Sequence, residues 1–387
     1  MVLTGNNDSS RFETVFDQQL KPFRKIENTL RTAENASYYC YTCGGQHGGM
    51  NYTYGTTGNM TYDSITAPTE PGSSAAGSPN AMGGGNGGGV IKLIVSNTIT
   101  NNGNISSNGT TQTSGGGGAG GSIYITTGTL TGAGSIVADG GAGCTNNCGS
   151  GGGGRIAIYY TSGISSFAYP SAMISNVHAF GGVNSTDIAA AGTVYLKNTS
   201  SQTYGDLVVN NNNYSTTVLT QLPQPTVSVS TGLTSTVLSA TNAFTNAHNL
   251  TNQLVGLYVD ANISQNATST IMDNSLFPIL SNTLSSLTIS SGNMTSVAVS
   301  GNTFKPVLYL DNFEVRGKAR LDFTGNYIAV REGDVGSDNT SSFVQDGYIN
   351  ATKVDVNTAA WTTTANAGGT ITTKCAATYN GAGSTCP

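Results

Sequence analysis

Residues 151–163 read GGGGRIAIYYTSG, four glycines followed at once by an alternating run. Ile156, Ile158 and Tyr160 alternate with Ala157 and Tyr159, which is the pattern of a β-strand. A glycine within ordered structure costs about 0.5–1 kcal/mol relative to alanine, so a run of four needs a compensating interaction. Close approach of backbones, where a Cβ atom would clash, supplies one. We therefore expect an ordered, tightly packed glycine wall, and a flexible loop is the alternative.

The same unit of glycine run and strand occurs four times. The copies are GGGNGGGVIKLIV (83–95), GGGGAGGSIYITT (115–127), GSGGGGRIAIYYT (149–161) and AAAGTVYLKNT (189–199). Their anchor residues Ile91, Ile123, Ile156 and Val194 lie 32, 33 and 38 residues apart. One unit is too small to bury its own apolar face, so neighbouring units must stack. The sequence predicts a mainly β protein, with a parallel β-solenoid of glycine-rich coils over residues 39–215.

The composition narrows the class of protein. Of 387 residues 52 are glycine and 9% are charged, with a net charge of −5. Recurring short strand patterns argue against disorder for most of the chain. Residues 41–300 hold only ten charged side chains, so no basic cluster there could follow a nucleic-acid backbone. No apolar run approaches the roughly 18 residues of a membrane helix, and the N-terminal MVLTGNNDSS has no signal-peptide core.

Residues 1–38 differ from the rest, because an apolar stripe at spacings of three and four predicts an amphipathic helix. Ser10 and Glu13 fit a capping box at its start, and Pro22 is expected to kink it. So large a stripe must cover something. We predict an assembly helix that mediates self-association, and a cap on the chain's own solenoid is the alternative. The stripe consists of Phe12, Phe16, Leu20, Phe23, Ile26 and Leu30.

Six cysteines fall into three local pairs, which predicts three short disulfide-closed loops and an oxidising compartment. Fifteen connectivities are formally allowed for six cysteines. Zinc is the rival interpretation of the first pair, but the next pair is distant and spaced differently from a zinc site. The predicted pairs are Cys40 with Cys43, Cys144 with Cys148, and Cys375 with Cys386.

Beyond the repeat the chain has two further predicted parts. QLPQPTVSVS, with Pro223 and Pro225, is typical of a boundary. Residues 216–356 continue with short β runs, as more solenoid or as a separate β domain. Residues 357–387 are expected to form a disulfide-closed tail.

Candidate chemistry is sparse. Asp139, Asp187 and Asp206 are isolated in sequence, as are the histidines His47, His178 and His248. No nucleophile elbow, zinc-protease or phosphate-loop motif occurs. We expect no cofactor and no catalytic centre, and a polysaccharide-acting β-helix enzyme with paired carboxylates is the alternative.

Short motifs suggest two kinds of site, one for a ligand and one for modification. Glu332, Asp334, Asp338 and Asn339 place hard oxygens close together, as Ca²⁺ prefers, and an ordinary solvated turn is the alternative. Glycosylation sequons suggest an exposed surface. The candidate acceptors are Asn35, Asn104, Asn198, Asn266 and Asn350.

The order of motifs from HGG through GGGVIKLIVSNTITNNGNISSNG and GGGGRIAIYY to AAGTVYLKNTSSQTYGDLVVNNN resembles the glycine-rich repeats of very large secreted or surface-attached bacterial proteins. The stretch RKIENTLRTAENASYYC is similar to the helix of type IV pilin-like proteins. These resemblances imply an extracellular, cell-surface structural or adhesive protein, with a filament or fibre subunit as one form of it. Expected partners are further copies of the chain, other surface proteins and glycans. A carbohydrate-binding module is the alternative, and an aromatic strip over a groove would favour it.

Overall fold

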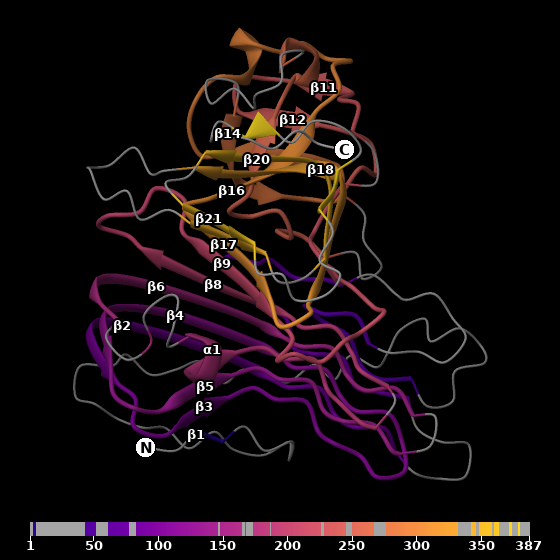
Figure 1. Cartoon of the computed structure of the whole chain (residues 1–387). Helices are drawn as coiled ribbons and strands as arrows, with labels where there is room; N and C mark the ends of the chain where they lie inside the picture. The colour runs from indigo at the N-terminus through magenta and orange to yellow at the C-terminus, as the bar shows by residue number, and fades with distance from the viewer. Residues whose placement is uncertain are drawn as a thin grey trace.

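A computed structural model of the chain shows a mainly β protein, as predicted (Figure 1). The structure describes residues 3–4, 43–51, 61–76, 83–145, 148–164, 167, 173–185, 187–225, 228–244, 250–266, 276–331, 342–345, 348–357, 360–363, 371–373 and 378–379. The predicted N-terminal helix and its apolar stripe lie outside these residues, as does most of the predicted tail.

The repeat units pair in parallel through strands β2 (Val90–Thr100), β4 (Ser122–Thr131), β6 (Arg155–Gly163) and β8 (Thr193–Asn198). Their anchor residues Ile91, Ile123, Ile156 and Val194 are register partners, so the alignment of the sequence units is confirmed. A second parallel sheet holds β3 (Asn104–Ser106), β5 (Ser135–Val137) and β7 (Val177–His178), with β1 (Leu3–Thr4) beside β3. The four-residue helix α1 (Met173–Asn176) directly precedes β7.

The inward side chains of these strands build the first apolar core. Ile123, Ile156 and Val194 pack there with Ile136 of β5 and Val177 of β7. Their outward neighbours in sequence, such as Ala157 and Tyr195, belong to a second core on the other face of the larger sheet. Because successive side chains of a strand point to opposite faces, both faces of β6 and β8 are buried.

The glycine runs form an ordered wall, so that prediction is confirmed. Gly117 and Gly120 donate backbone hydrogen bonds to Gly149 and Gly152, at 3.0 and 2.9 Å. The amides one residue further along, Gly118 and Gly121, donate to a different run, at Thr110 and Ser107. Every third amide of residues 117–121 thus donates to the same neighbouring segment. This is the period of the extended left-handed helix with three residues per turn, which makes no internal hydrogen bonds.

The runs stack as three sets of extended segments, which we call the glycine bundle (Figure 1, lower right). The middle set, which includes residues 115–121, bonds to both outer sets. Glycine is required where these backbones meet. A Cβ atom at Gly118 would lie 1.9 Å from the carbonyl oxygen of Asn86, and one at Gly151 would lie 2.0 Å from that of Gly118. The bundle comprises residues 43–50, 72–76, 83–89, 107–112, 115–121, 138–143, 148–154, 178–182 and 188–192.

The parallel repeat ends earlier than predicted. Strand β9 (Asp206–Asn210) runs antiparallel to β8, so the predicted parallel solenoid to residue 215 is wrong at this point. No glycine run separates the two strands. A short turn reverses the chain instead, and Gly205 in that turn has a φ of 94°, which favours glycine.

Beyond β9 the described residues between 216 and 357 form an upper region above the larger sheet, apart from two strands that join that sheet (Figure 1). The strands from here to the last described residues are β10 (Thr220–Gln221), β11 (Gly232–Leu233), β12 (Val237–Ser239), β13 (Tyr258–Asp260), β14 (Leu276–Asn282), β15 (Ser286–Ile289), β16 (Lys305–Leu310), β17 (Asn312–Arg316), β18 (Arg320–Arg331), β19 (Ser342–Gln345), β20 (Tyr348–Asn357), β21 (Ala360–Thr363), β22 (Ile371–Thr373) and β23 (Thr378–Tyr379). Strands β11 to β15 pair antiparallel, and β16, β18, β20 and β22 pair in parallel. β17 pairs with β9 and so extends the larger sheet through β19 and β21.

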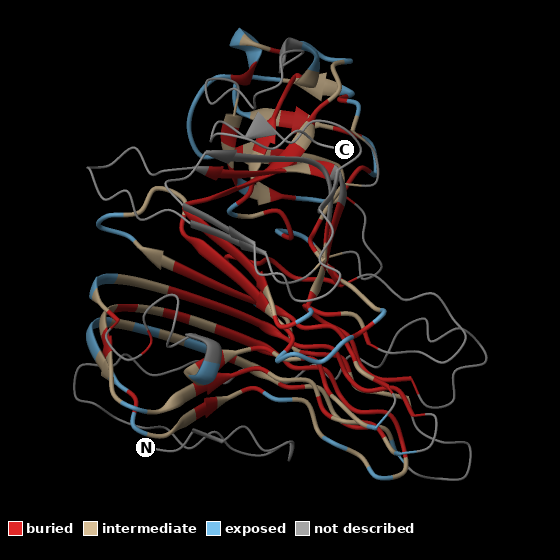
Figure 2. Cartoon of the chain, in the orientation of Figure 1, coloured by how far each residue is buried: buried red, intermediate tan, exposed pale blue. Residues whose placement is uncertain are grey.

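The second core fills the space between the larger sheet and the upper region, where Figure 2 shows buried segments. Phe313 and Val315 of β17 meet Phe304, Phe323 and other apolar side chains there. Short 3-10 helices at Ile263–Asn266 and Met294–Ser296 connect strands of this region.

Candidate functional site

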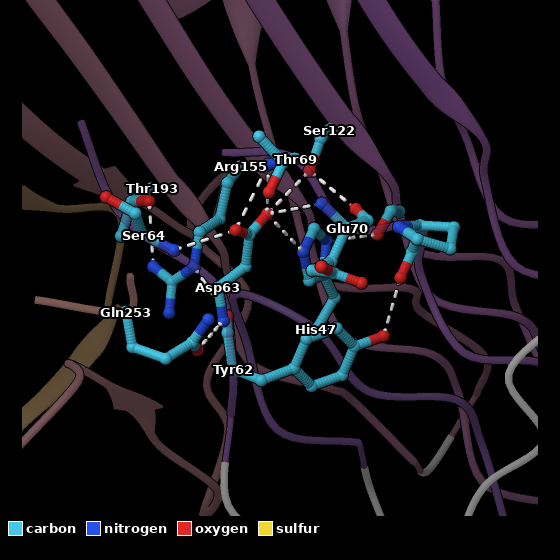
Figure 3. Close-up of polar contacts among 12 residues, drawn as sticks. His47, Tyr62, Asp63, Ser64, Thr69, Glu70, Ser122, Arg155, Thr193 and Gln253 are labelled. Carbon is cyan, nitrogen blue, oxygen red and sulfur yellow. Dashed lines mark hydrogen bonds and ion pairs between the residues drawn. The ribbon is translucent and has the colours of Figure 1, made fainter. Parts of the chain in front are cut away.

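Three polar side chains occupy the first positions of three neighbouring strands. Ser122 of β4, Arg155 of β6 and Thr193 of β8 are register partners, and all three are buried. They point to the outward face of the larger sheet (Figure 3). Residues 61–71, which we call the crossing loop, pass over the sheet there. Arg155 donates through Nη1 to Thr193 Oγ1 at 3.0 Å and through Nε to the Tyr62 carbonyl at 2.8 Å.

Asp63 is the centre of this buried network. Its carboxylate accepts from Ser122 Oγ at 2.9 Å and from the backbone amides of Thr69 and Glu70 at 2.9 and 3.0 Å. His47 Nε2 lies 3.2 Å from the same carboxylate, and His47 Nδ1 donates to the Gly120 carbonyl at 2.9 Å. One carboxylate therefore ties the crossing loop to β4 and to the glycine bundle.

The charges of the network compensate one another. Burial by itself would raise the pKa of Asp63. The hydrogen bond and charge of His47, with the Glu70 amide and Arg155, outweigh burial and hold that pKa below its ordinary value. Burial lowers the pKa of Arg155 to about 10, opposed by the charge of Asp63, so the guanidinium stays charged at neutral pH. The side chains of His47 and Asp63 are sealed from solvent, and the network's chemistry is that of a structural clamp.

A tyrosine ladder lies next to the clamp on the same sheet face. The rings of Tyr124 and Tyr159 have centroids 5.6 Å apart, and those of Tyr159 and Tyr195 lie 5.8 Å apart. Lys92 of β2 places its ammonium 5.3 Å from the Tyr124 ring centroid, within cation–π range. The Tyr159 hydroxyl donates to the Thr66 carbonyl, and burial raises its pKa. The ladder runs from half-buried Tyr124 to buried Tyr195.

The ladder continues into a second tyrosine group. The Tyr195 hydroxyl donates to the carbonyl of Tyr204, whose ring lies 4.3 Å from Tyr309 and 5.6 Å from Tyr258. Beyond it, Lys305 places its ammonium 5.6 Å from the Tyr327 ring. Tyr327 packs in the same small apolar cluster as Tyr204, Tyr258 and Tyr309. Tyrosines therefore lie at intervals from β4 to β18, with a lysine over the first ring and over the last.

An open groove of about 420 Å³ lies between the crossing loop and the upper region. One carboxylate, Glu70, stands among small polar and aliphatic side chains. Such a lining suits a ligand that offers both hydroxyl groups and apolar faces. The groove is lined by Ala67, Thr69, Glu70, Leu250, Thr251, Asn252, Val255, Leu280 and Ser281.

The structure describes both cysteines of only one of the three predicted pairs. Cys144 and Cys148 form the predicted disulfide, which closes a turn between two segments of the glycine bundle. Cys43 is disulfide-bonded, and its predicted partner Cys40 lies outside the described residues. Cys375 and Cys386 also lie outside them.

Asp139 and His178, which are isolated in sequence, come together through stacking of the repeat. Asp139 Oδ1 lies 2.8 Å from His178 Nδ1 and accepts the Phe180 amide at 2.7 Å. The His178 ring stacks on Phe180. Asp187 Oδ2 accepts from Asn184 Nδ2 at 3.4 Å, whereas His248 lies outside the described residues.

Asp206 also gains partners, one of them from a strand more than a hundred residues away. Its carboxylate accepts from Asn312 Nδ2 at 2.6 Å and from Gln202 Nε2 at 2.7 Å. Burial raises its pKa to about 7, and the charges of Asp311 and Glu314 add to the rise. These acidic groups meet where β9 pairs with β17.

The other predicted sites stay predictions. Asn104 and Asn198 are half-buried at strand positions, and the backbone of Asn266 and Asn350 is described. Asn35 and all four candidate calcium ligands, Glu332, Asp334, Asp338 and Asn339, lie outside the described residues.

Sequence reasoning missed the clamp and the ladder. Arg155 interrupts a run of glycine and apolar residues as the first residue of its strand, and aligned units put Ser122 and Thr193 at that position. Tyr124, Tyr159 and Tyr195 fall at alternate outward positions. Aligning the outward positions of the units would have put Ser122, Arg155 and Thr193 in one row and Tyr124 beside the position of Tyr195. It would not have found Asp63 and His47, which lie outside the aligned units, or Tyr159, which falls two positions further along its strand.

The chain was compared with protein-family models, curated proteins and solved structures. No family model, curated protein or solved structure matches the chain. Within the described ranges, no helix has the length and apolar character needed to span a membrane.

Proposed function

We propose that the chain is an extracellular structural or adhesive protein of a cell surface, built as a subunit of a larger fibre or layer. In this proposal the four repeat units act as one parallel β-solenoid whose glycine bundle makes it rigid. The observation that carries the proposal is the glycine bundle, with its three sets of backbone-bonded segments.

Several physical properties of the bundle support a durable external scaffold. Backbone hydrogen bonds do not titrate, and ions screen them little compared with surface ion pairs. The Cys144–Cys148 disulfide closes one of its turns, and such bonds persist in oxidising compartments. The low charge of the repeat adds few groups whose protonation could weaken it.

The experiment that tests this function is surface labelling of the source cells. An antibody raised against residues 83–198 should label intact cells, and protease added outside should remove the label. Labelling that appears only after the cells are permeabilised would contradict the proposal. Mass spectrometry of the native protein without reductant should recover the Cys144–Cys148 crosslink.

A second candidate function, carbohydrate binding, is favoured by the tyrosine ladder and by the groove. The Tyr159 hydroxyl of the ladder donates to Thr66, the residue before Ala67 of the groove lining. Sugar rings stack on aromatic faces, and the groove offers small polar groups and aliphatic contacts. Tyr124, at the end of the ladder, is half-buried, whereas Tyr195 at the other end is buried. A glycan array tests this candidate, and Tyr124→Ala should remove any binding. Tyr214→Ala is the control, because it changes an exposed tyrosine outside the ladder, and it should leave binding unchanged.

A further inference from the structure

Strand β2 lies at the end of the larger sheet. It pairs with β4 over nine residue positions, and no described strand pairs with its other edge. Its eleven residues, Val90–Thr100, are VIKLIVSNTIT. The backbone groups along that edge are a template for another strand.

The inward side chains of β2 are less covered than their register partners. Leu93 and Val95 are half-buried, whereas Ile125 and Thr127, which occupy the same positions in β4, are buried. On the outward face Ile94 is 60% exposed. Within the described part of the chain, β2 therefore lacks a neighbouring strand on one side, whereas β4 and β6 have one on each side.

The first half of this edge has little protection against pairing. Residues 90–95 are VIKLIV, which combines strong β-propensity with a single charge and no proline or glycine. A register shift between Val95 and Thr98 separates this half from the rest of β2. Edge strands of natural proteins usually carry charges, proline or bulges that prevent pairing with another chain. Here only Lys92 and the register shift could have this effect.

We propose that residues 90–95 of β2 form a self-association surface that pairs antiparallel with the same residues of a second copy, with Leu93 opposite Leu93. This contact goes beyond the proposed function, because it would serve a surface scaffold and a carbohydrate-binding module alike.

The pattern of side chains selects the partner and the register. A strand pairing that keeps inward residues on one face must match residues of the same parity, because a one-residue slip exchanges the faces. Centring on Lys92 would set two lysines directly opposite, which is unfavourable. Centring on Leu93 sets Ile91 against Val95 inside and Lys92 against Ile94 outside. The edge is therefore complementary to itself, as a two-fold interface requires.

The test uses opposite charges at Ile94, whose exposure makes substitution tolerable to the fold. In the pair, Ile94→Lys would face Lys92 of the second copy, whereas Ile94→Glu would form an ion pair with it. We expect sedimentation of the full chain to show reversible dimers, with the dissociation constant raised at least tenfold by Ile94→Lys and not raised by Ile94→Glu. Val299→Lys, at a 65% exposed valine elsewhere, is the control and should change nothing.

Hydrogen exchange supplies a readout that needs no variant. Amides of residues 90–95 should exchange more slowly at high than at low protein concentration. A chain that stays monomeric at every concentration would overturn the proposal, because another segment would then have to cover the edge. Equal weakening by Ile94→Lys and Ile94→Glu would overturn the register, and so would weakening by Val299→Lys as large as that by Ile94→Lys.

Discussion

The glycine bundle and the core beneath the upper region order the same chain by different means. In the bundle, backbone groups hydrogen-bond to the backbone of neighbouring segments, and most of the residues are glycine or alanine. In the core, Phe304, Phe313 and Phe323 remove large apolar surfaces from water. The difference shows that stability can reside in segments whose composition resembles a flexible linker, provided that the runs recur at a period that brings them together.

The two regions should respond differently to added volume. Gly118→Ala puts a Cβ atom where the Asn86 carbonyl oxygen lies, and only backbone could move to admit it. We expect this one methyl group to cost more than about 4 kcal/mol, or to prevent folding, since strained packing of this kind is exceptional. Urea unfolding measures the effect. Gly83→Ala is the matched control, because nothing lies within 4 Å of the place that its added Cβ atom would take, and equal losses for both variants would contradict the packed bundle.

The clamp joins the bundle to the strands, and breaking it should be the next largest effect. Asp63→Ala leaves Arg155 as a buried charge without its counter-charge, at a cost of about 3–5 kcal/mol. The depressed pKa of Asp63 also gives a sign to the pH dependence. Its contribution should be full above the ordinary carboxyl pKa of 3.8 and should disappear as pH falls through the lower folded-state value. Urea unfolding between pH 2 and 6 should show a larger loss of stability on acidification in wild type than in Asp63→Ala.

Asp206 predicts the opposite pH dependence, at the junction of β9 and β17. Its folded-state pKa of about 7 exceeds the ordinary 3.8, so its contribution is greatest below pH 4 and is lost as pH rises to 7. Asp206→Asn keeps an oxygen to accept from Asn312 and Gln202. We expect this variant to be a few kcal/mol more stable than wild type at pH 8 and equal to it at pH 4. A variant less stable than wild type at pH 8 would show that burial does not destabilise the carboxylate.

The smallest effect is expected at the disulfide turn of the bundle. Cys144→Ser with Cys148→Ser opens a very short loop, for which chain entropy gives about 2 kcal/mol. Differential scanning calorimetry should show a lower melting temperature with an unchanged fold. A loss as large as that of Gly118→Ala would mean that the turn, rather than the backbone bonding, orders the bundle.

The sequence predicts the repeat well, because its period carries the register. Ile91, Ile123, Ile156 and Val194 were aligned by their glycine runs, and the strands pair at these residues. The Cys144–Cys148 bond was predictable for a similar reason, since its ends are local in the chain. The reversal at β9 was not, because it depends on one turn rather than on a repeated pattern.

The candidate site was less predictable, because its members come from distant segments. Asp63 meets His47, and the Tyr62 carbonyl meets Arg155, only after residues 61–71 have packed on three strands. Asp206 meets Asn312 only because β17 returns to β9. Neither contact can be predicted from the spacing of residues within a short stretch of sequence.

Amide hydrogen exchange of the glycine runs tests the central claim most directly. The amides of Gly117, Gly118, Gly120 and Gly121 donate to other segments of the bundle, so their exchange should be slowed about as strongly as that of Ile156 and Ile158 in β6. Opening of so many shared bonds requires unfolding of the bundle as a unit. Exchange of these glycines at the rate of an unstructured chain, while β6 remains protected, would contradict the account.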